Sequence, residues 1–194
     1  MTAKLQEILR FARSKYIPVM PDDTKELLYK LAKQHRPKRI LEIGTAIGYS
    51  GIVLLTASPH ATLNTIEFDE ERAEMARRNF ADAGVYDRVN LFVGDAKEIV
   101  PQLTGQYDFI FMDGPKGQYE VFLPYLEEVL QRGGILVCDN VLYKGLVEHI
   151  PDKRHKHITV ARNLNSFLRR ITADDSLETT VYRIGDGVSV TRKI

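Results

Sequence analysis

Five acidic residues stand where short apolar runs of the sequence end. In chain order they are Glu42, Glu67, Asp95, Asp113 and Asp139. One acid after a strand often does no more than start a turn, but five in succession form a pattern. In an open parallel sheet, ligands bind beyond the carboxyl ends of the strands. The pattern therefore predicts a polar site along one edge of a sheet.

Two of these positions offer oxygen donors that suit a hard cation. Asp113 ends the apolar run 107–113, and Asp139 with Asn140 ends the run 133–140. In the usual strand order of such a sheet these runs are neighbours about 4.8 Å apart, so their last side chains converge. Two carboxylates and an amide fit Mg²⁺ or another divalent cation, with positions left for water and substrate oxygens. The alternative is that Asp139 and Asn140 only form a turn.

The loop EIGTAIGYSG indicates a nucleoside site. Its glycines stand at positions 44, 48 and 51, a spacing that departs from G-x-G-x-x-G, and tight strand-to-helix turns need glycine in any case. Glu67 strengthens the interpretation, because an acid that ends the second strand is placed to accept hydrogen bonds from a ribose diol. Glu42 and Asp113 favour S-adenosylmethionine, which has a sulfonium and an amino group, over NAD with its pyrophosphate. The alternative is a structural acid beside turn glycines.

The elements that must position these residues alternate along the chain. Strand patterns cover 39–44, 62–68, 88–95, 107–113 and 133–140, and helix patterns cover 50–58, 69–84, 96–103 and 119–134. This alternation is typical of βαβ units, with a parallel sheet between helices. In the helix over 69–84, Asp69 is suited to cap the start and Gly84 to end it.

Both ends of the chain depart from this alternation. Amphipathic helices are expected over 3–16 and 22–35, and residues 178–194 hold two strand-like runs around Gly-Asp-Gly, typical of an antiparallel hairpin. We predict an α/β, Rossmann-like fold with a seven-stranded, mostly parallel sheet, a C-terminal antiparallel hairpin and helices on both faces. No linker or repeat is evident, so we expect a single domain over 1–194, with helices at 1–36 and the core at 37–194.

Composition places bounds on location and partners. The chain has 194 residues, 44% of them hydrophobic, and no apolar run long enough to cross a membrane or to serve as a signal peptide. We therefore expect a cytoplasmic protein without a membrane partner. The single cysteine, Cys138, lies in an apolar run and predicts a buried thiol. The net charge of +1 gives no overall signal for nucleic acid.

Basic residues are concentrated in one segment, 144–170. A solvated helix face with a loop explains this about as well as a polyanion-binding patch does. Two histidines, His155 and His157, lie in the same segment, where a solvated loop is a better explanation than a metal site. The segment's seven basic residues, set against Glu148 and Asp152, are Lys144, Lys153, Arg154, Lys156, Arg162, Arg169 and Arg170.

Together the motifs resemble those of class I S-adenosylmethionine-dependent methyltransferases, in particular the metal-dependent branch that is similar to catechol O-methyltransferase. The resemblance lies in LEIGTAIGYS, the acid of TIEFDEERA, VGDAKE, the D-x-x-K of MDGPK, and DNV after the fifth strand, and it covers most of the chain. It implies that Ser50 and the backbone of Gly44 hold the methionine moiety, Glu67 the ribose, and Asp95 with Ala96 the adenine edge. The implied cofactor contacts are Met20, Glu42, Gly44, Ser50, Glu67, Asp95, Ala96 and Asp113.

The resemblance also implies a mechanism. A cation held by Asp113, Asp139 and Asn140 would chelate two adjacent substrate oxygens and lower the pKa of the hydroxyl to be methylated. Lys116 resembles the family's catalytic lysine, which takes up or steers the hydroxyl proton; a surface lysine in a Gly-Pro-Lys-Gly loop is the alternative. Asp113 would serve both the metal and the cofactor's amino group. Met20 matches the loop that closes over the cofactor, or simply packs.

The acceptor is the least constrained feature. The chain has no Trp, which the catechol branch is expected to use around its pocket. KGQY, DNVLYKGLV and GDGVSV resemble a bacterial subgroup of tRNA methyltransferases that convert 5-hydroxyuridine at the anticodon wobble position to 5-methoxyuridine. Tyr119 or Tyr143 would then stack on the base, and segment 144–170 would meet the anticodon-stem phosphates; both tyrosines are equally consistent with packing.

Other acceptors and assemblies stay open. A small catechol or phenol is the alternative acceptor, and a non-catalytic nucleoside-binding module is a distant one. The family also implies a homodimer, although the chain starts late relative to the additional N-terminal helix that helps to form the dimer contact in relatives.

Overall fold

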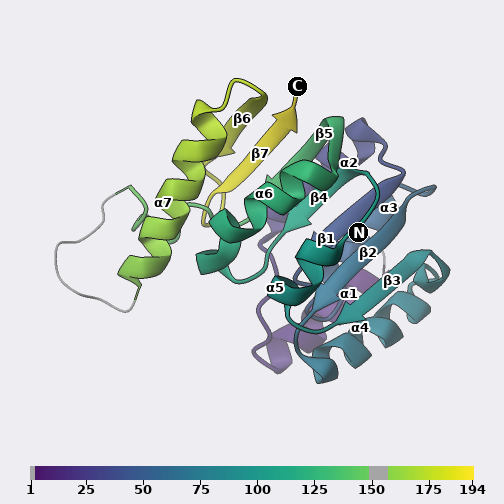
Figure 1. Ribbon diagram of the computed structural model, residues 1–194. Coiled ribbons are helices and arrows are strands. Elements are labelled where there is room, and N and C mark those ends of the chain that lie inside the picture. Colours follow the sequence, from purple (N-terminus) through teal and green to yellow (C-terminus); the bar gives the residue numbers. More distant parts are fainter. Residues whose placement is uncertain (1–2, 149–156) are drawn as a thin grey trace. The chain divides into compact units, whose positions relative to one another are not determined.

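A computed structural model describes residues 3–148 and 157–194 of the chain. These residues form two compact units, within 1–99 and 100–194, in which helices and strands alternate as expected (Figure 1). The predicted single domain over 1–194 stays a prediction. Within the described ranges, every helix is too short or too polar to cross a membrane.

The first unit contains three parallel strands connected by helices. β1 pairs with β2 and β2 with β3, both in parallel, which gives the order β3-β2-β1. β1 and β2 are largely buried, whereas β3 is half exposed. The elements are α1 (Ala3–Ser14), α2 (Asp22–His35), β1 (Arg39–Ile43), α3 (Tyr49–Ala57), β2 (Thr62–Glu67), α4 (Glu70–Asp82), β3 (Val89–Val93) and α5 (Ala96–Ile99).

The predicted ends of α4 are confirmed by their hydrogen bonds. The Asp69 side chain accepts from the N–H of Arg72 at 3.0 Å and so caps the first turn. At the other end Gly84 has φ +69°, and the N–H of Val85 donates to the carbonyl of Phe80 at 3.0 Å. This is the glycine-terminated helix end that satisfies the last carbonyls.

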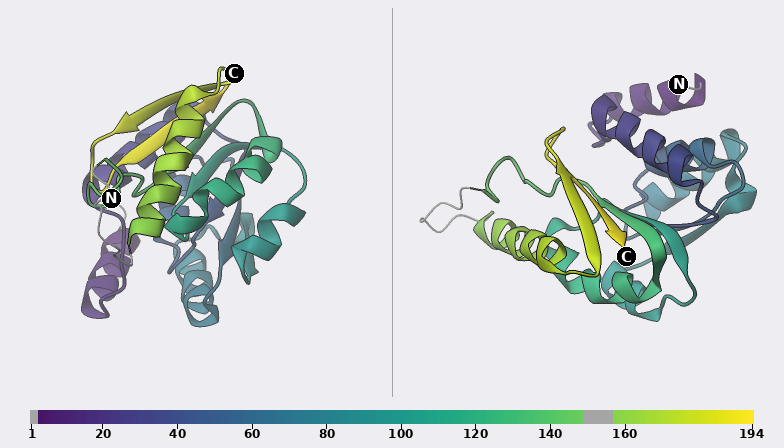
Figure 2. Two further views of the ribbon diagram at one scale, coloured as in Figure 1. Left: turned by 60° about the vertical axis from the view of Figure 1, so that its left-hand side comes forward. Right: turned by 90° about the horizontal axis from the view of Figure 1, so that it is seen from above.

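The second unit contains four strands and two long helices. β4 pairs with β5 in parallel, and β5-β7-β6 is antiparallel, so the predicted terminal hairpin is confirmed. α6 and α7 lie side by side (Figure 1, Figure 2) and are joined by Ser166–Glu120 and Arg170–Glu127 contacts. The elements are β4 (Tyr107–Met112), α6 (Tyr119–Val129), β5 (Leu130–Cys138), α7 (Ile158–Ala173), β6 (Leu177–Tyr182) and β7 (Val188–Lys193).

Two predicted helices are shorter in the structure. The helix expected over 119–134 ends at Val129, and β5 begins at Leu130. Gly133 has φ +80°, a left-handed conformation that a helix does not accommodate, and the pairing of β5 with β4 shifts register there. The helix expected over 96–103 is α5 followed by a 3₁₀ turn at Val100–Gln102, because Pro101 has no N–H to donate to the carbonyl of Lys97 in a continuing α-helix.

α7 corresponds to no predicted element. Its buried residues recur every three or four positions, which is the pattern of an amphipathic helix. They are Ile158, Ala161, Leu164, Phe167 and Ile171.

The predicted burial of Cys138 is confirmed, since its side chain is fully enclosed and burial raises the pKa of its thiol.

Candidate functional site

The loop between β1 and α3 has the conformation that its glycines predict. Gly44 and Gly48 have φ values of +100° and +83°, in the region that favours glycine. The N–H of Gly44 donates to the carbonyl of Ile66 in β2 at 3.0 Å. A Cβ on Gly51, in α3, would lie 2.8 Å from Leu63 and 2.9 Å from Phe80. The glycines therefore permit both the turn and the close packing of α3.

Glu42 and Ser50, both predicted cofactor contacts, lie in contact with each other. Glu42 is fully buried, and its carboxylate accepts hydrogen bonds from Ser50 Oγ at 2.5 Å and Thr65 Oγ1 at 2.6 Å. The hydroxyl of Thr65 is also 2.5 Å from that of Thr45. This network joins the end of β1, the loop, α3 and β2 around one carboxylate.

Glu67 holds the loop from the end of β2. Its Oε2 accepts from the N–H of Ala46 at 2.6 Å, and its Oε1 accepts from the N–H of Asp69 at 3.0 Å. Each carboxylate oxygen has a further lone pair for a hydroxyl. The ribose role of Glu67 stays a prediction, and the structure adds a role in the loop that its position in the sequence did not indicate.

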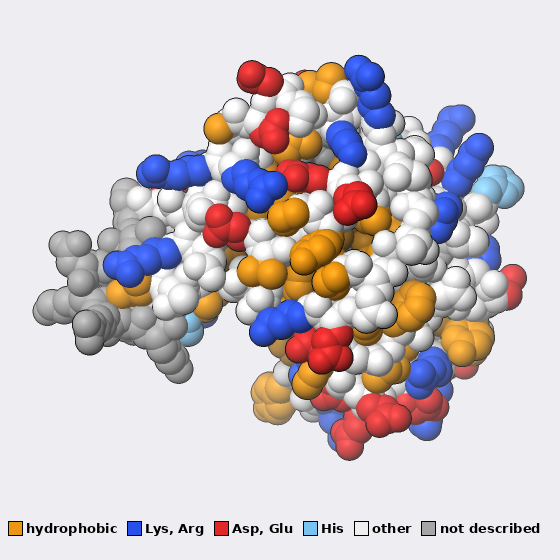
Figure 3. Space-filling model, in the orientation of Figure 1, with side chains coloured by type: hydrophobic (Ala, Val, Ile, Leu, Met, Phe, Trp, Pro, Cys, Tyr) orange, Lys and Arg blue, Asp and Glu red, His pale blue; other side chains and the backbone are white. Residues whose placement is uncertain are grey.

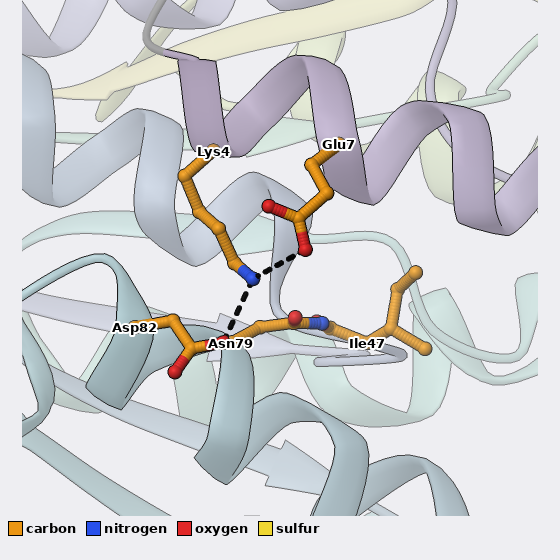
Figure 4. A network of polar contacts seen from close by, with 5 residues as sticks. All are labelled: Lys4, Glu7, Ile47, Asn79 and Asp82. Atoms are coloured by element: carbon orange, nitrogen blue, oxygen red, sulfur yellow. Dashed lines mark hydrogen bonds and ion pairs between the residues drawn. The ribbon is translucent and has the colours of Figure 1, made fainter.

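Asn79 of α4 also holds this loop, and sequence reasoning missed it. Its Nδ2 donates to the carbonyl of Ile47 at 2.8 Å. One turn further along α4, Asp82 pairs with Lys4 of α1 at 2.8 Å, and Lys4 also reaches Glu7 at 3.1 Å (Figure 4). Asn is a weak helix former. Its presence beside Phe80 in the predicted helix was therefore the available sequence signal for a role outside the helix.

The remaining predicted cofactor residues of the first unit lie at two places. Asp95 begins α5: its Oδ1 accepts from the N–H of Lys97 at 2.9 Å, and Ala96 beside it is buried. The N–H of Gly94 donates to the carbonyl of Glu67 at 2.9 Å, so Asp95 and Ala96 adjoin the end of β2. Met20 lies half-buried in the segment before α2, and its cofactor contact stays a prediction.

In the second unit the ends of β4 and β5 bring Asp113 and Asp139 together. The N–H of Asp139 donates to the carbonyl of Met112 at 3.0 Å. Asp139 is 2% exposed; burial, and next the negative charge of Asp113, raise its pKa to about 6. Asn140 has φ +57°, and its N–H donates to Asp139 Oδ1 at 2.7 Å.

Lys116 lies against Asp113 in the turn that follows β4. Its Nζ forms an ion pair with Asp113 Oδ1 and lies 6.0 Å from the centre of the Tyr119 ring. The side chains of Lys116 and Asp113 are 20% and 29% exposed, so both are open to a ligand. The structure thus places the predicted catalytic pair in contact, three positions apart in the chain.

The donors at these strand ends fit a hard divalent cation. Within residues 3–148 and 157–194, no three His, Cys, Asp or Glu side chains cluster as metal ligands. A cation would therefore depend on Asp113 and Asp139 together with the amide of Asn140. Two carboxylates close enough to raise a pKa leave negative charge that a cation would neutralise, and such oxygen donors suit Mg²⁺.

The prediction that Tyr119 stacks on a base is wrong. Its side chain is fully buried, and its hydroxyl donates to the carbonyls of Met112 and Asp139, each at 3.0 Å. A ring enclosed in this way has no face to offer to a ligand. Tyr143 remains a candidate for stacking: it is half-buried, and its hydroxyl is 2.7 Å from His157 Nδ1.

The basic segment is only partly described, because residues 149–156, with Lys153, Arg154, His155 and Lys156, lie outside the described ranges. In the described part, Lys144, Arg162 and Arg169 are exposed, whereas Arg170 pairs with Glu127 at 2.9 Å. In the view of Figure 3, Lys and Arg side chains are interspersed with Asp and Glu. The surface in that view carries no uniform basic patch.

Comparison with known proteins places these features in a family. The sequence profile described as O-methyltransferase matches residues 2–194. Catechol O-methyltransferase from Bos taurus is 30% identical over 166 residues, which cover 81% of this chain and 61% of the bovine protein. Catechol O-methyltransferase from Niastella koreensis is 34% identical over 165 residues, 82% of this chain and 74% of that protein.

A solved structure matches over the full length of the chain. It is the O-methyltransferase TomG of Streptomyces achromogenes, involved in tomaymycin synthesis, in complex with S-adenosylmethionine. The identity is 28% and the TM-score 0.89, over 100% of this chain and 90% of TomG. The match confirms the predicted fold class, a Rossmann-like α/β fold with a seven-stranded, mostly parallel sheet and a C-terminal antiparallel hairpin.

Proposed function

The chain belongs to the O-methyltransferase family, and from this we propose that it moves the methyl group of S-adenosylmethionine to a hydroxyl that has an adjacent oxygen, with the help of a divalent cation. One observation carries the proposal. Asp113 and Asp139 end neighbouring strands, and the charge of Asp113 helps to raise the pKa of Asp139 to about 6. Two carboxylates in that arrangement repel each other, and a bound divalent cation would neutralise their charge.

Cofactor binding is assigned to the first unit. Ser50 and the backbone of Gly44 would hold the methionine moiety, with Glu42 accepting the hydrogen bond of Ser50. Glu67 would hold the ribose, and Asp95 with Ala96 the adenine edge. Support comes from TomG, which matches this chain over its full length and was solved in complex with S-adenosylmethionine. Further support comes from the loop, whose backbone is held by hydrogen bonds to Glu67 and Asn79.

The metal and the proton are assigned to the second unit. Asp113, Asp139 and Asn140 would hold the cation, which supplies the positive charge that lowers the pKa of the substrate hydroxyl. Asp113 and Asp139 bind through their carboxylates and Asn140 through its amide oxygen. Lys116, whose Nζ pairs with Asp113, would steer the hydroxyl proton as an ammonium, or take it up after losing one of its own protons to water. Methyl transfer then needs only that the oxygen and the sulfonium methyl meet in line.

We propose 5-hydroxyuridine at the tRNA wobble position as the acceptor. Its 5-hydroxyl and 4-oxo groups are adjacent and so can be bound by one cation. Exposed Lys144, Arg162 and Arg169 belong to the same unit as the metal residues and could bind phosphates. The absence of Trp also favours an acceptor other than a catechol.

A small catechol is the second candidate, and the comparisons favour it. Two relatives that are at least 30% identical to this chain are named catechol O-methyltransferases. A catechol also presents two adjacent oxygens, so the proposed metal site serves both acceptors equally.

A direct competition distinguishes the two acceptors. Purified protein, labelled S-adenosylmethionine and Mg²⁺ are offered tRNA that contains 5-hydroxyuridine, beside catechol, and label is counted in each. Label in tRNA supports the proposed acceptor; label in catechol alone overturns it.

Charge reversal provides a further test of the same point. Arg162→Glu with Arg169→Glu should reduce tRNA methylation by about tenfold or more at low salt, because phosphate contacts dominate affinity for nucleic acid, and should leave catechol methylation unchanged. The matched control is Lys30→Glu with Lys97→Glu, which makes the same change of charge at exposed positions of the first unit and should affect neither acceptor.

A further inference from the structure

We infer that Tyr119 is a positioning residue. It fixes the distance between the ends of β4 and β5, where the proposed metal ligands Asp113 and Asp139 lie. The inference rests on the proposed metal site. Its basis is one hydroxyl group that donates to two carbonyls, those of Met112 and Asp139, each at 3.0 Å. Met112 directly precedes Asp113, and Asp139 is itself a proposed ligand. The phenol therefore joins the backbone at both carboxylates.

The geometry of this bridge leaves little freedom to either strand end. The carbonyl of Met112 also accepts the N–H of Asp139 at 3.0 Å, so it receives one donor from Tyr119 and one from the end of β5. The hydroxyl has a single proton, and it can serve both carbonyls only while each of them stays within hydrogen-bond distance of its oxygen. A change in the separation of Asp113 and Asp139 would break this three-centre arrangement.

The ring of Tyr119 is itself held from several sides. It is fully buried, and it meets Phe167 of α7 edge-on, with ring centres 5.7 Å apart and planes at 75°. The turn before it is held by Asn163 of α7, whose Nδ2 donates to the carbonyl of Gly117 at 2.9 Å. α7 thus supports the phenol, and the phenol supports the metal residues.

The hydroxyl's role can be separated from that of the ring. Phenylalanine fills the same space and retains the contact with Phe167, so Tyr119→Phe removes only the bridge. Groups that hold metal ligands in place without touching the metal typically change metal affinity by about 10- to 100-fold when they are lost. A purely structural tyrosine would change stability and leave metal affinity as it was.

The test measures Mn²⁺ binding to the full chain by titration calorimetry. Mn²⁺ can replace Mg²⁺ in this measurement because both cations prefer oxygen ligands. We expect Tyr119→Phe to weaken Mn²⁺ binding by about tenfold, while the Kd for S-adenosylhomocysteine stays within about twofold of the wild-type value. The matched control is Thr179→Val, which also removes a hydroxyl that donates to a backbone carbonyl, that of Ile171 at 2.7 Å, in the same unit. This control should lose stability but retain Mn²⁺ affinity.

The outcomes separate this inference from the proposed function. Wild-type Mn²⁺ affinity in folded Tyr119→Phe overturns the positioning role and leaves the metal mechanism standing. Failure of the wild-type protein itself to bind Mn²⁺ or Mg²⁺ overturns both. If Tyr119→Phe does not fold, Phe167→Leu decides, because it loosens the ring but keeps the hydroxyl: weakened Mn²⁺ binding supports the inference, and unchanged binding contradicts it.

Discussion

At the scale of single residues, Asp139 links the site to the stability of the protein. Its carboxyl is buried beside Asp113, and its pKa is raised from 3.8 to about 6. A carboxyl with a raised pKa favours folding when it is protonated. Its contribution is fully present below about pH 3.8 and is lost as the pH rises through 6. At neutral pH the metal-free protein therefore carries an unfavourable buried charge.

Replacement by Asn should remove this penalty. We expect Asp139→Asn to raise the free energy of unfolding of the metal-free protein by about 3 kcal/mol at pH 8, which corresponds to the rise of the Asp139 pKa from 3.8 to about 6. The gain should shrink steadily as the pH falls from 6 to 4. Urea unfolding in the presence of a chelator, at several pH values, measures it. A gain that does not vary with pH would show that Asp139 is not the titrating group.

For Lys116 and Glu67, the sequence predicted some of the contacts in the structure and not others. The D-x-x-K spacing placed Lys116 near Asp113, and the two side chains are in contact. The end of a strand marked Glu67 as a site residue, but nothing in its position indicated that its two oxygens accept N–H groups of Ala46 and Asp69. Tertiary hydrogen bonds of this kind have no local pattern.

At the scale of elements, α4 positions the loop between β1 and α3 in the first unit. Asn79 binds the carbonyl of Ile47 in the loop, and the adjacent Phe80 lies beneath Gly48 and Gly51. One helix thus carries both a polar and an apolar contact to the loop between β1 and α3, to which we assign the cofactor. Both contacts can be removed separately.

Loss of the polar contact should weaken cofactor binding. We expect Asn79→Ala to raise the Kd for S-adenosylhomocysteine by about three- to tenfold, the equivalent of one neutral hydrogen bond. Titration calorimetry measures it. The control is Lys4→Ala, which breaks the ion pair of α1 with Asp82 of α4 (Figure 4) but not the contact with the loop, and its Kd should match the wild-type value. Equal loss in both variants would assign the effect to general loosening of α4.

A methyl group at Gly51 should disturb the apolar contact. Gly51→Ala would place a Cβ 2.8 Å from Leu63 and 2.9 Å from Phe80, all of them buried. We expect a loss of about 1 to 3 kcal/mol in the free energy of unfolding, although Ala is the better helix former. Thermal or urea unfolding measures it. A stabilised Gly51→Ala variant would contradict the packing described for α3.

Gly84→Ala is a useful contrast for the same experiment. Among the residues that the structure describes, no atom lies within 4 Å of its added Cβ, and its φ is +69°. Its cost should come from backbone strain alone, about 1 kcal/mol, and it should leave cofactor affinity unchanged.

Sequence reasoning succeeded for elements whose ends are set locally. α4 starts at an Asp cap and stops before a glycine, and α2 spans the predicted residues 22–35. It failed where tertiary pairing decides: the helix expected to 134 ends at Val129 because β5 starts there to pair with β4. The role of Tyr119 was missed because it follows from burial against α7, and α7 was not among the predicted helices.

At the scale of the whole molecule, the two units divide the proposed chemistry between them. The residues assigned to the cofactor, apart from Asp113, fall within 1–99, and those assigned to metal and proton fall within 100–194. Apart from variants of Asp113, which is assigned to both, cofactor binding and metal binding should therefore respond to separate sets of variants. Transfer of the methyl group should require both.

The most direct test of the proposed function is the metal dependence of methyl transfer. Labelled S-adenosylmethionine is supplied with catechol and, separately, with tRNA that contains 5-hydroxyuridine, before and after treatment with a chelator, for the wild-type protein and Asp139→Ala. We expect transfer to at least one acceptor, its loss in chelator, its recovery with Mg²⁺, and a reduction of about 100-fold or more in Asp139→Ala. Transfer that persists in chelator, or full activity in Asp139→Ala, would contradict the metal mechanism.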